Sequence, residues 1–196
     1  MPCLSIQLDG AQVTTIDLDE MHVVDVSVRG SLDQVPRATL GAMGGNYGEG
    51  GCGHLIWVSD LSVQPGQSVS VEFTEDCAMG DRGRTIQELF PDDEPCTETD
   101  FALTEAMIAE IRARPNLHES FAVQIETSTG QHAIAVSNER STSFTFRVLW
   151  DWTRPSQVRV HLSTHFLDDI IERNGGTNHM EEFLSFENGA LFTLLP

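Results

Sequence analysis

The chain has 196 residues, of which 40% are hydrophobic and 21% charged, a composition typical of a folded domain rather than a disordered chain. Its formal net charge at pH 7 is −19, and arginine supplies all eleven basic side chains. The negative charge argues against binding to nucleic acid or to an anionic membrane, and the absence of lysine excludes a Schiff-base lysine and a phosphate-loop lysine. The first ten residues, MPCLSIQLDG, lack the basic and apolar regions of a signal peptide, so we expect a cytoplasmic protein.

Alternating apolar and polar residues predict strands in the first half of the chain. Residues 4–8 and 24–28 follow this pattern, and Asp9-Gly10 is typical of a hairpin turn after the first of them. The glycine-rich segment from Gly44 to Gly53 is expected to be a flexible loop. Strands at 54–58 and 68–73 follow it, and Pro65-Gly66 predicts a turn that pairs these two strands as neighbours.

The second half begins after an acidic, proline-containing stretch at residues 91–98. A helix is predicted from a cap at Thr99 or Asp100 to Pro115, and a shorter helix over 166–173. Four alternating segments between residues 120 and 164 predict strands, with a hairpin at Ser128-Thr129-Gly130 and another hairpin around Asn188-Gly189.

These elements predict a mainly β fold with a few helices. We expect a β-sandwich-like unit in residues 1–92 and a strand-rich α+β unit in residues 93–196. The two halves show no evident sequence repeat, and the pattern leaves open whether they pack as one unit.

One segment carries a recognisable signature. Trp57, Leu61 and Gly66 form a Trp-x(3)-Leu-x(4)-Gly pattern that leads into the alternating strand of Val69, Val71 and Phe73. Over residues 3–76 the chain resembles a family of short bacterial proteins with this strand–turn–strand signature, although Gln67 stands where an acidic residue is usual. The resemblance implies a β-sandwich-like domain, and it implies no catalytic activity.

Two histidines in VHLSTHFLDD are the first candidates for a metal site. His161 and His165 are four residues apart, as are two zinc ligands on one helix face. The alternation of Val158, Val160 and Leu162 instead predicts a strand, on which residues four apart lie about 13 Å from each other. The simpler interpretation is a strand end followed by a helix whose first turn holds Asp168 and Asp169.

A second candidate metal site consists of Cys52, His54 and Cys77. Cysteine and histidine side chains are zinc ligands, and the predicted pairing of strands 54–58 and 68–73 would bring these residues close together. No fourth ligand is evident, and free thiols are the simpler interpretation.

Three aromatic residues are candidates for contact with a partner protein. Tyr47 lies in the glycine-rich segment, which lacks both the lysine and the following helix of a phosphate loop. Trp150 and Trp152 would share one face of a strand, either as part of the core or as an exposed aromatic platform for a sugar or a protein partner.

No catalytic set and no cofactor motif is evident, so we expect a non-catalytic binding protein. Its net charge of −19 favours a basic protein partner. One alternative is a metal-assisted hydrolase that uses His161, His165 and nearby carboxylates. The other is a structural β module whose edge strands form a homo-oligomer.

Overall fold

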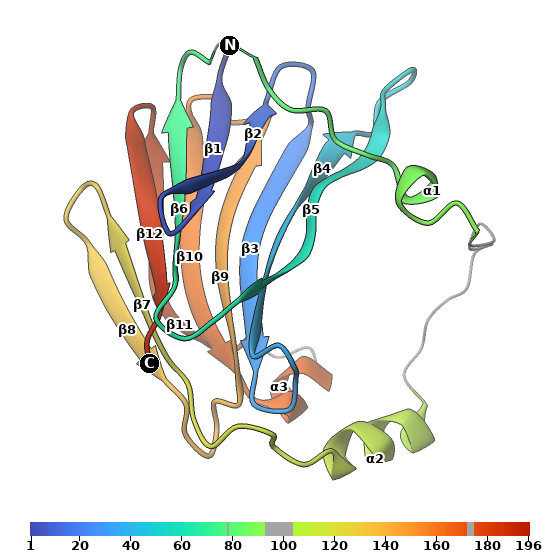
Figure 1. The fold of residues 1–196 in the computed structure, drawn as a ribbon, viewed down its shortest axis with the longest axis vertical. Helices are drawn as coiled ribbons and strands as arrows, with labels where there is room; N and C mark the ends of the chain where they lie inside the picture. The colour runs from blue at the N-terminus through green and yellow to red at the C-terminus, as the bar shows by residue number, and fades with distance from the viewer. Residues whose placement is uncertain (78, 93–103, 172–174) are drawn as a thin grey trace.

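The computed structural model describes residues 1–77, 79–92, 104–171 and 175–196. Two six-stranded antiparallel sheets pack face to face, which confirms the predicted mainly β, sandwich-like fold (Figure 1). The first sheet has the strand order β2-β1-β6-β12-β7-β8, and the second has the order β11-β10-β9-β3-β4-β5.

The strands of the first sheet are β1 (Cys3–Leu8), β2 (Ala11–Asp17), β6 (Ser68–Thr74), β7 (Ala122–Thr127), β8 (His132–Val136) and β12 (Asn188–Leu194). Those of the second sheet are β3 (Val23–Ser31), β4 (Ala38–Asn46), β5 (Gly53–Val63), β9 (Ser143–Asp151), β10 (Gln157–His165) and β11 (Thr177–Ser185). Three short helices, α1 (Ile86–Leu89), α2 (Glu105–Ala113) and α3 (Leu167–Ile171), lie outside the sheets.

The core lies between the sheets and follows from the alternation in the sequence. Successive strand residues point to opposite faces, so the apolar set of each strand faces the other sheet. Phe192 of β12 is fully buried, and its ring stacks on those of Phe144 and Phe146 of β9, with centroids 5.8 and 5.3 Å away. Aromatic stacking between the sheets therefore fills the centre of the sandwich.

The two halves of the chain form an internal structural repeat. Each half contributes a hairpin to the first sheet (β1–β2, β7–β8), three successive strands to the second (β3–β5, β9–β11) and one strand back to the first (β6, β12). When each strand of one half is replaced by its counterpart in the other half, each sheet keeps the same strand order, now read from its opposite edge. A two-fold axis through the sheets has this effect. From β3 to β4 and from β9 to β10, residues 120 positions apart are equivalent, such as Val23 with Ser143 and Leu40 with Val160.

The repeat bears on the predicted domain boundary. The first repeat ends with β6 and the second begins with β7, so the predicted boundary between residues 92 and 93 falls in the connection between the repeats. Each sheet nevertheless contains strands of both repeats, because β12 pairs with β6 and β9 pairs with β3. The described residues therefore share one core rather than two.

Two predicted hairpins form and two do not. The turns at Asp9-Gly10 and at Ser128 to Gly130 connect paired strands as predicted. The turn at Pro65-Gly66 instead leads from β5 in the second sheet to β6 in the first, and the turn before Asn188 leads from β11 to β12 in the same way. The predicted hairpins at these two positions are therefore wrong, since both turns carry the chain across the sandwich.

The predicted helices are present with different limits. Thr104 caps α2 through a hydrogen bond from Met107 N to its hydroxyl, while the predicted caps Thr99 and Asp100 lie outside the described residues. The second helix is limited to α3. The glycine-rich segment is partly strand, because β4 continues to Asn46 and β5 begins at Gly53. Within the described ranges, no helix is long and apolar enough to cross a membrane.

Candidate functional site

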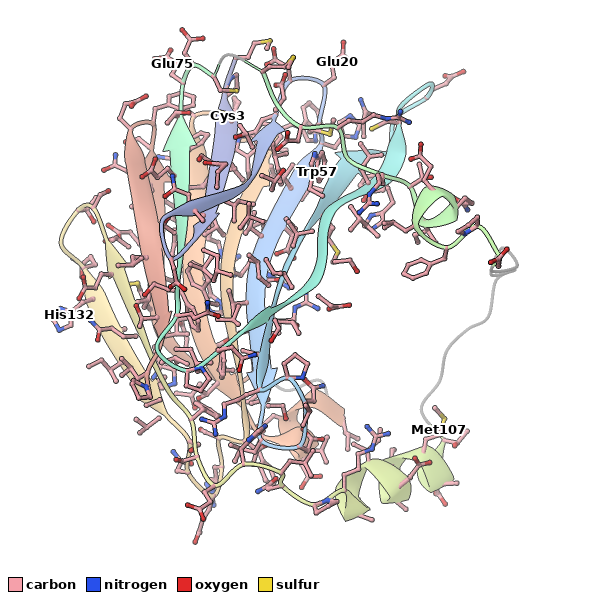
Figure 2. All side chains as sticks on the ribbon, in the orientation of Figure 1. Cys3, Glu20, Trp57, Glu75, Met107 and His132 are labelled. Carbon is pink, nitrogen blue, oxygen red and sulfur yellow. The ribbon has the colours of Figure 1, made fainter. Side chains whose placement is uncertain are left out.

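One end of the sandwich carries a concentration of loop carboxylates. The connections β2–β3, β4–β5, β9–β10 and β11–β12 meet at this end, because alternate strands of both sheets end there. Together with the adjoining strand ends they hold six carboxylates and one arginine, Arg154; the six are Asp17, Asp19, Glu20, Glu49, Asp151 and Glu187. We call this the acidic end; Figure 2 shows Glu20 there, and Glu75 after β6 lies on the same side.

An exposed indole lies at the acidic end. Trp152 follows directly after β9, and its side chain is 61% exposed. Its backbone N–H donates to the carbonyl oxygen of His22 at 3.0 Å, and the next residue, Thr153, donates its N–H to the Asp151 carboxylate. The ring of His22 lies 5.6 Å from the Trp152 ring, centroid to centroid. The indole is therefore held on a fixed turn and faces solvent.

Tyr47 lies next to the same histidine. Its backbone N–H donates to His22 Nδ1 at 3.2 Å, and its hydroxyl lies 2.9 Å from His54 Nδ1. The Tyr47 side chain is 57% exposed. His22 thus connects Trp152 to Tyr47, and Tyr47 connects to His54. We call these four residues the aromatic patch.

Glycine allows the strands beneath the patch to approach closely. A Cβ atom added at Gly45 would lie 1.9 Å from the carbonyl oxygen of Gly53 across the β4–β5 pair. The carbonyl oxygen of Gly45 in turn accepts the N–H of His22 at 2.8 Å. The glycine-rich segment therefore positions both Tyr47 and His22, in addition to forming a loop.

The two predicted tryptophans have different environments. Trp150 is only 3% exposed, and it points into the core with Val148 while its indole N–H donates to the carbonyl oxygen of Pro155. Trp152 lies beyond the end of the strand, so the two do not share a face. The exposed tryptophan pair that would form a platform is therefore not present; the two exposed aromatic residues beside His22 are Trp152 and Tyr47.

His161 and His165 lie on β10, with His165 as its last residue. The strand interpretation is therefore confirmed, and α3 begins two residues later. Asp168 forms an ion pair with Arg112 of α2, with an N–O distance of 2.6 Å. Burial lowers the pKa of both histidines below the usual value, which favours the neutral imidazole over the charged form.

Cys52, His54 and Cys77 do not come together as the second candidate metal site requires. The His54 ring is hydrogen-bonded to the Tyr47 hydroxyl, and Cys52 lies exposed in the β4–β5 connection. Cys77 follows β6, which lies in the other sheet and does not pair with β5 as the site would require. Across the described ranges, no group of three or more His, Cys, Asp or Glu side chains is arranged to hold a metal ion.

The cysteines are expected to differ strongly in reactivity. Burial, followed by interaction with Cys3, raises the pKa of Cys77 to about 12, whereas Cys52 is exposed. At pH 8 a thiol with that pKa is about one part in 10,000 thiolate, the reactive form. In a Cys96→Ser background, iodoacetamide at pH 8 should modify Cys52 first and leave Cys77 unmodified, as measured by peptide mass spectrometry. Equal labelling rates of Cys52 and Cys77 would contradict this expectation.

Sequence reasoning found two members of the aromatic patch as contact residues, Tyr47 and Trp152. It considered His54 as a metal ligand, and it identified neither His54 nor His22 as a contact residue. His22 precedes β3 by one residue and belongs to no motif, so only the pairing of β3 with β4 and β9 reveals its central position.

Comparison with known proteins adds no relative to this description. The chain matches no family model, and neither the curated proteins nor the solved structures contain a significant match. The resemblance over residues 3–76 therefore stays a prediction.

Proposed function

We propose that this protein is a non-catalytic binding protein that recognises a basic segment of a partner protein through the aromatic patch. The proposal includes the cytoplasmic location expected from the sequence. The observation that carries it is the exposure of Trp152 and Tyr47, on a hydrogen-bonded support, at an end of the molecule that holds six carboxylates and only one arginine in its connections and adjoining strand ends.

The chemistry of the patch suits cationic side chains. The face of an aromatic ring attracts guanidinium and ammonium groups, and tryptophan is the most effective ring for this purpose. Glu20 and Glu49 lie in the two connections that hold His22 and Tyr47, so a cation bound over the rings would also lie near carboxylates. The carboxylates would accelerate association, and the rings would supply much of the affinity.

The support of the patch is already formed without a partner. Asn46 donates its side-chain N–H to the carbonyl oxygen of Glu20 at 2.6 Å and accepts the N–H of Gly48 at 3.0 Å. These bonds join the β2–β3 and β4–β5 connections directly. A preformed site loses less conformational entropy when it binds, which favours affinity.

Binding of a fluorescent arginine octapeptide tests the proposal. We expect fluorescence anisotropy to show binding at low ionic strength and at least tenfold weaker binding at 0.5 M salt, because exposed charges are screened. A Glu20→Gln/Glu49→Gln protein should bind more weakly than wild type at low salt. A Glu119→Gln/Glu139→Gln protein is the matched control, since it loses the same charge at the other end of the sandwich and should bind as wild type.

Two outcomes would count against the proposal. An octapeptide that fails to bind at low salt would remove the basic partner. Equal losses in the two double variants would show that net charge attracts the peptide and that the acidic end has no special part. An uncharged glycine–serine octapeptide measured in parallel excludes non-specific peptide binding.

A homo-oligomer remains a second candidate because of one edge strand. Ile134 and Val136 of β8 are 56% and 55% exposed, and β8 ends the first sheet without a further neighbour. Exposed apolar residues on an edge strand favour pairing with another chain. Light scattering at increasing protein concentration, with an Ile134→Lys protein as comparison, measures this association directly.

A further inference from the structure

A cleft lies at the opposite end of the sandwich from the aromatic patch. It has a volume of about 1000 Å³ and lies where β3, β9 and β10 meet α2 and the start of α3. This volume is at the upper end of the range for sites that bind small molecules. We call it the end cleft.

The end cleft and the aromatic patch occupy equivalent positions in the two repeats. The cleft is lined by the end of β3 with its following loop, by the start of β9 and by the end of β10. The equivalent segments of the other repeat, 120 residues away, are the end of β9, the start of β3 and the end of β4. These segments hold the aromatic patch. Leu32 is thus the counterpart of Trp152, and Leu167 that of Tyr47. The same position in the fold therefore carries different side chains in each repeat.

The floor of the end cleft is polar but contains no carboxylate. It consists of outward-facing residues on the adjacent strands β3, β9 and β10. Arg29 pairs with Thr145, and Ser31 pairs with Ser143, which in turn pairs with His165. His165 is fixed by a 2.9 Å contact between its Nε2 and the hydroxyl of Ser163. Leu32, Phe166 and Leu167 add an apolar wall.

Arg29 is the least engaged of the cleft arginines. Arg112 pairs with Asp168 at 2.6 Å and Arg114 pairs with Glu110 at 3.6 Å. Arg29 approaches Asp25 only to 3.9 Å, and Asp25 is shared with Arg147, which lies closer at 3.2 Å. Two guanidinium groups thus share one carboxylate, which leaves positive charge beside the floor.

The neighbour of Arg29 also has free hydrogen-bonding capacity. The hydroxyl of Thr145 makes no hydrogen bond within the described part of the chain, whereas those of Ser31 and Ser143 are engaged by Asp33 and by the carbonyl oxygen of His165. A guanidinium beside a free hydroxyl matches an oxyanion. The carboxylates that line the cleft lie on the surrounding loops and on α3: Asp33 accepts from the Ser31 hydroxyl, Asp168 pairs with Arg112, and Glu119 and Glu139 lie at the rim.

We propose that the end cleft binds a small organic anion, whose carboxylate or phosphate group contacts Arg29 and Thr145 while its apolar body packs against Leu32, Phe166 and Leu167. This site is separate from the aromatic patch and does not depend on the function proposed for it. In this interpretation one repeat recognises a cation and the other an anion, at equivalent places in the fold.

Isothermal titration calorimetry with phenyl phosphate and phenylacetate tests the proposal. The two probes share an apolar body and differ in head group, so their relative affinities distinguish phosphate from carboxylate recognition. We expect at least one of them to bind, and benzyl alcohol, which has no charge, to bind at least tenfold more weakly. Inorganic phosphate measures the contribution of the head group alone.

Variants locate the binding. Arg29→Gln should weaken the affinity for the bound probe at least tenfold, because the ligand loses its charged donor. Arg82→Gln is the matched control: Arg82 is an exposed arginine paired with Glu88, away from the cleft, and its loss should leave the affinity unchanged. Trp152→Ala should also leave it unchanged. Failure of both probes to bind, or an Arg29→Gln protein with wild-type affinity, would overturn the proposal.

Discussion

Replacing Phe192 by alanine is expected to lower the free energy of unfolding by about 3–5 kcal/mol. Phe192 is fully buried in β12, and its ring stacks on Phe144 and Phe146 of the opposite sheet. Its removal leaves a cavity at the point where both sheets and both repeats meet, and surrounding strands in a sandwich have little freedom to close it. For a chain of this size the loss corresponds to a fall in Tm of about 6–20 °C, measurable by calorimetry.

Leu191→Ala is the matched control for this effect. Leu191 is the preceding residue on the same strand, and it points away from the core with 40% of its side chain exposed. Its truncation should lower the free energy of unfolding by less than about 1 kcal/mol. Similar losses in the two variants would contradict the central role that the structure gives to stacking between the sheets.

The fold class could be predicted from the sequence because alternation is a local property. Val24, Val26 and Val28 identify a strand wherever that strand pairs. The strand with which a strand pairs is not decided locally. Pro65-Gly66 and Asn188-Gly189 have the residues of hairpin turns, yet both connect strands of different sheets. A turn signal specifies a change of direction, whereas the apolar face of each strand and its global partners decide which sheet it joins.

The internal repeat is invisible in the sequence for a related reason. Equivalent positions need only keep the same burial, and several apolar residues satisfy that demand. Val24 and Phe144 are equivalent and buried, but they differ greatly in volume, as do Ala42 and Leu162. Strand order in the sheets preserves the relationship where residue identity does not.

The candidate site was predictable only in part. Trp152 and Tyr47 are large aromatic residues in segments with turn-forming neighbours, and such residues are often exposed contacts. Trp150 shares the alternation of Trp152, and only the end of β9 at Asp151 separates the buried ring from the exposed one. The end cleft has no sequence signature, because Arg29, Thr145 and His165 meet through strand pairing alone.

Replacing Trp152 by alanine is expected to weaken binding of the arginine octapeptide about 30-fold, which corresponds to about 2 kcal/mol. The indole is 61% exposed, and its support is the hydrogen bond from the Trp152 backbone N–H to the His22 carbonyl oxygen, which alanine retains. The substitution should therefore leave Tm unchanged within about 2 °C, so a loss of affinity cannot be attributed to unfolding. Fluorescence anisotropy measures the affinity, and Ile134→Ala, which truncates a similarly exposed residue on β8, is the control.

Salt separates the contribution of the ring from that of the carboxylates. A cation packed on an indole face is partly desolvated, so its attraction is screened less than that between exposed charges. The ratio of wild-type to Trp152→Ala affinity should accordingly persist at 0.3 M salt, while the effect of Glu20→Gln/Glu49→Gln should diminish. Trp152→Phe should recover part of the affinity, because phenylalanine keeps an aromatic face of smaller area. If Trp152→Ala and Trp152→Phe bind equally to wild type, the peptide is held by charge alone and the aromatic patch has no part in recognition.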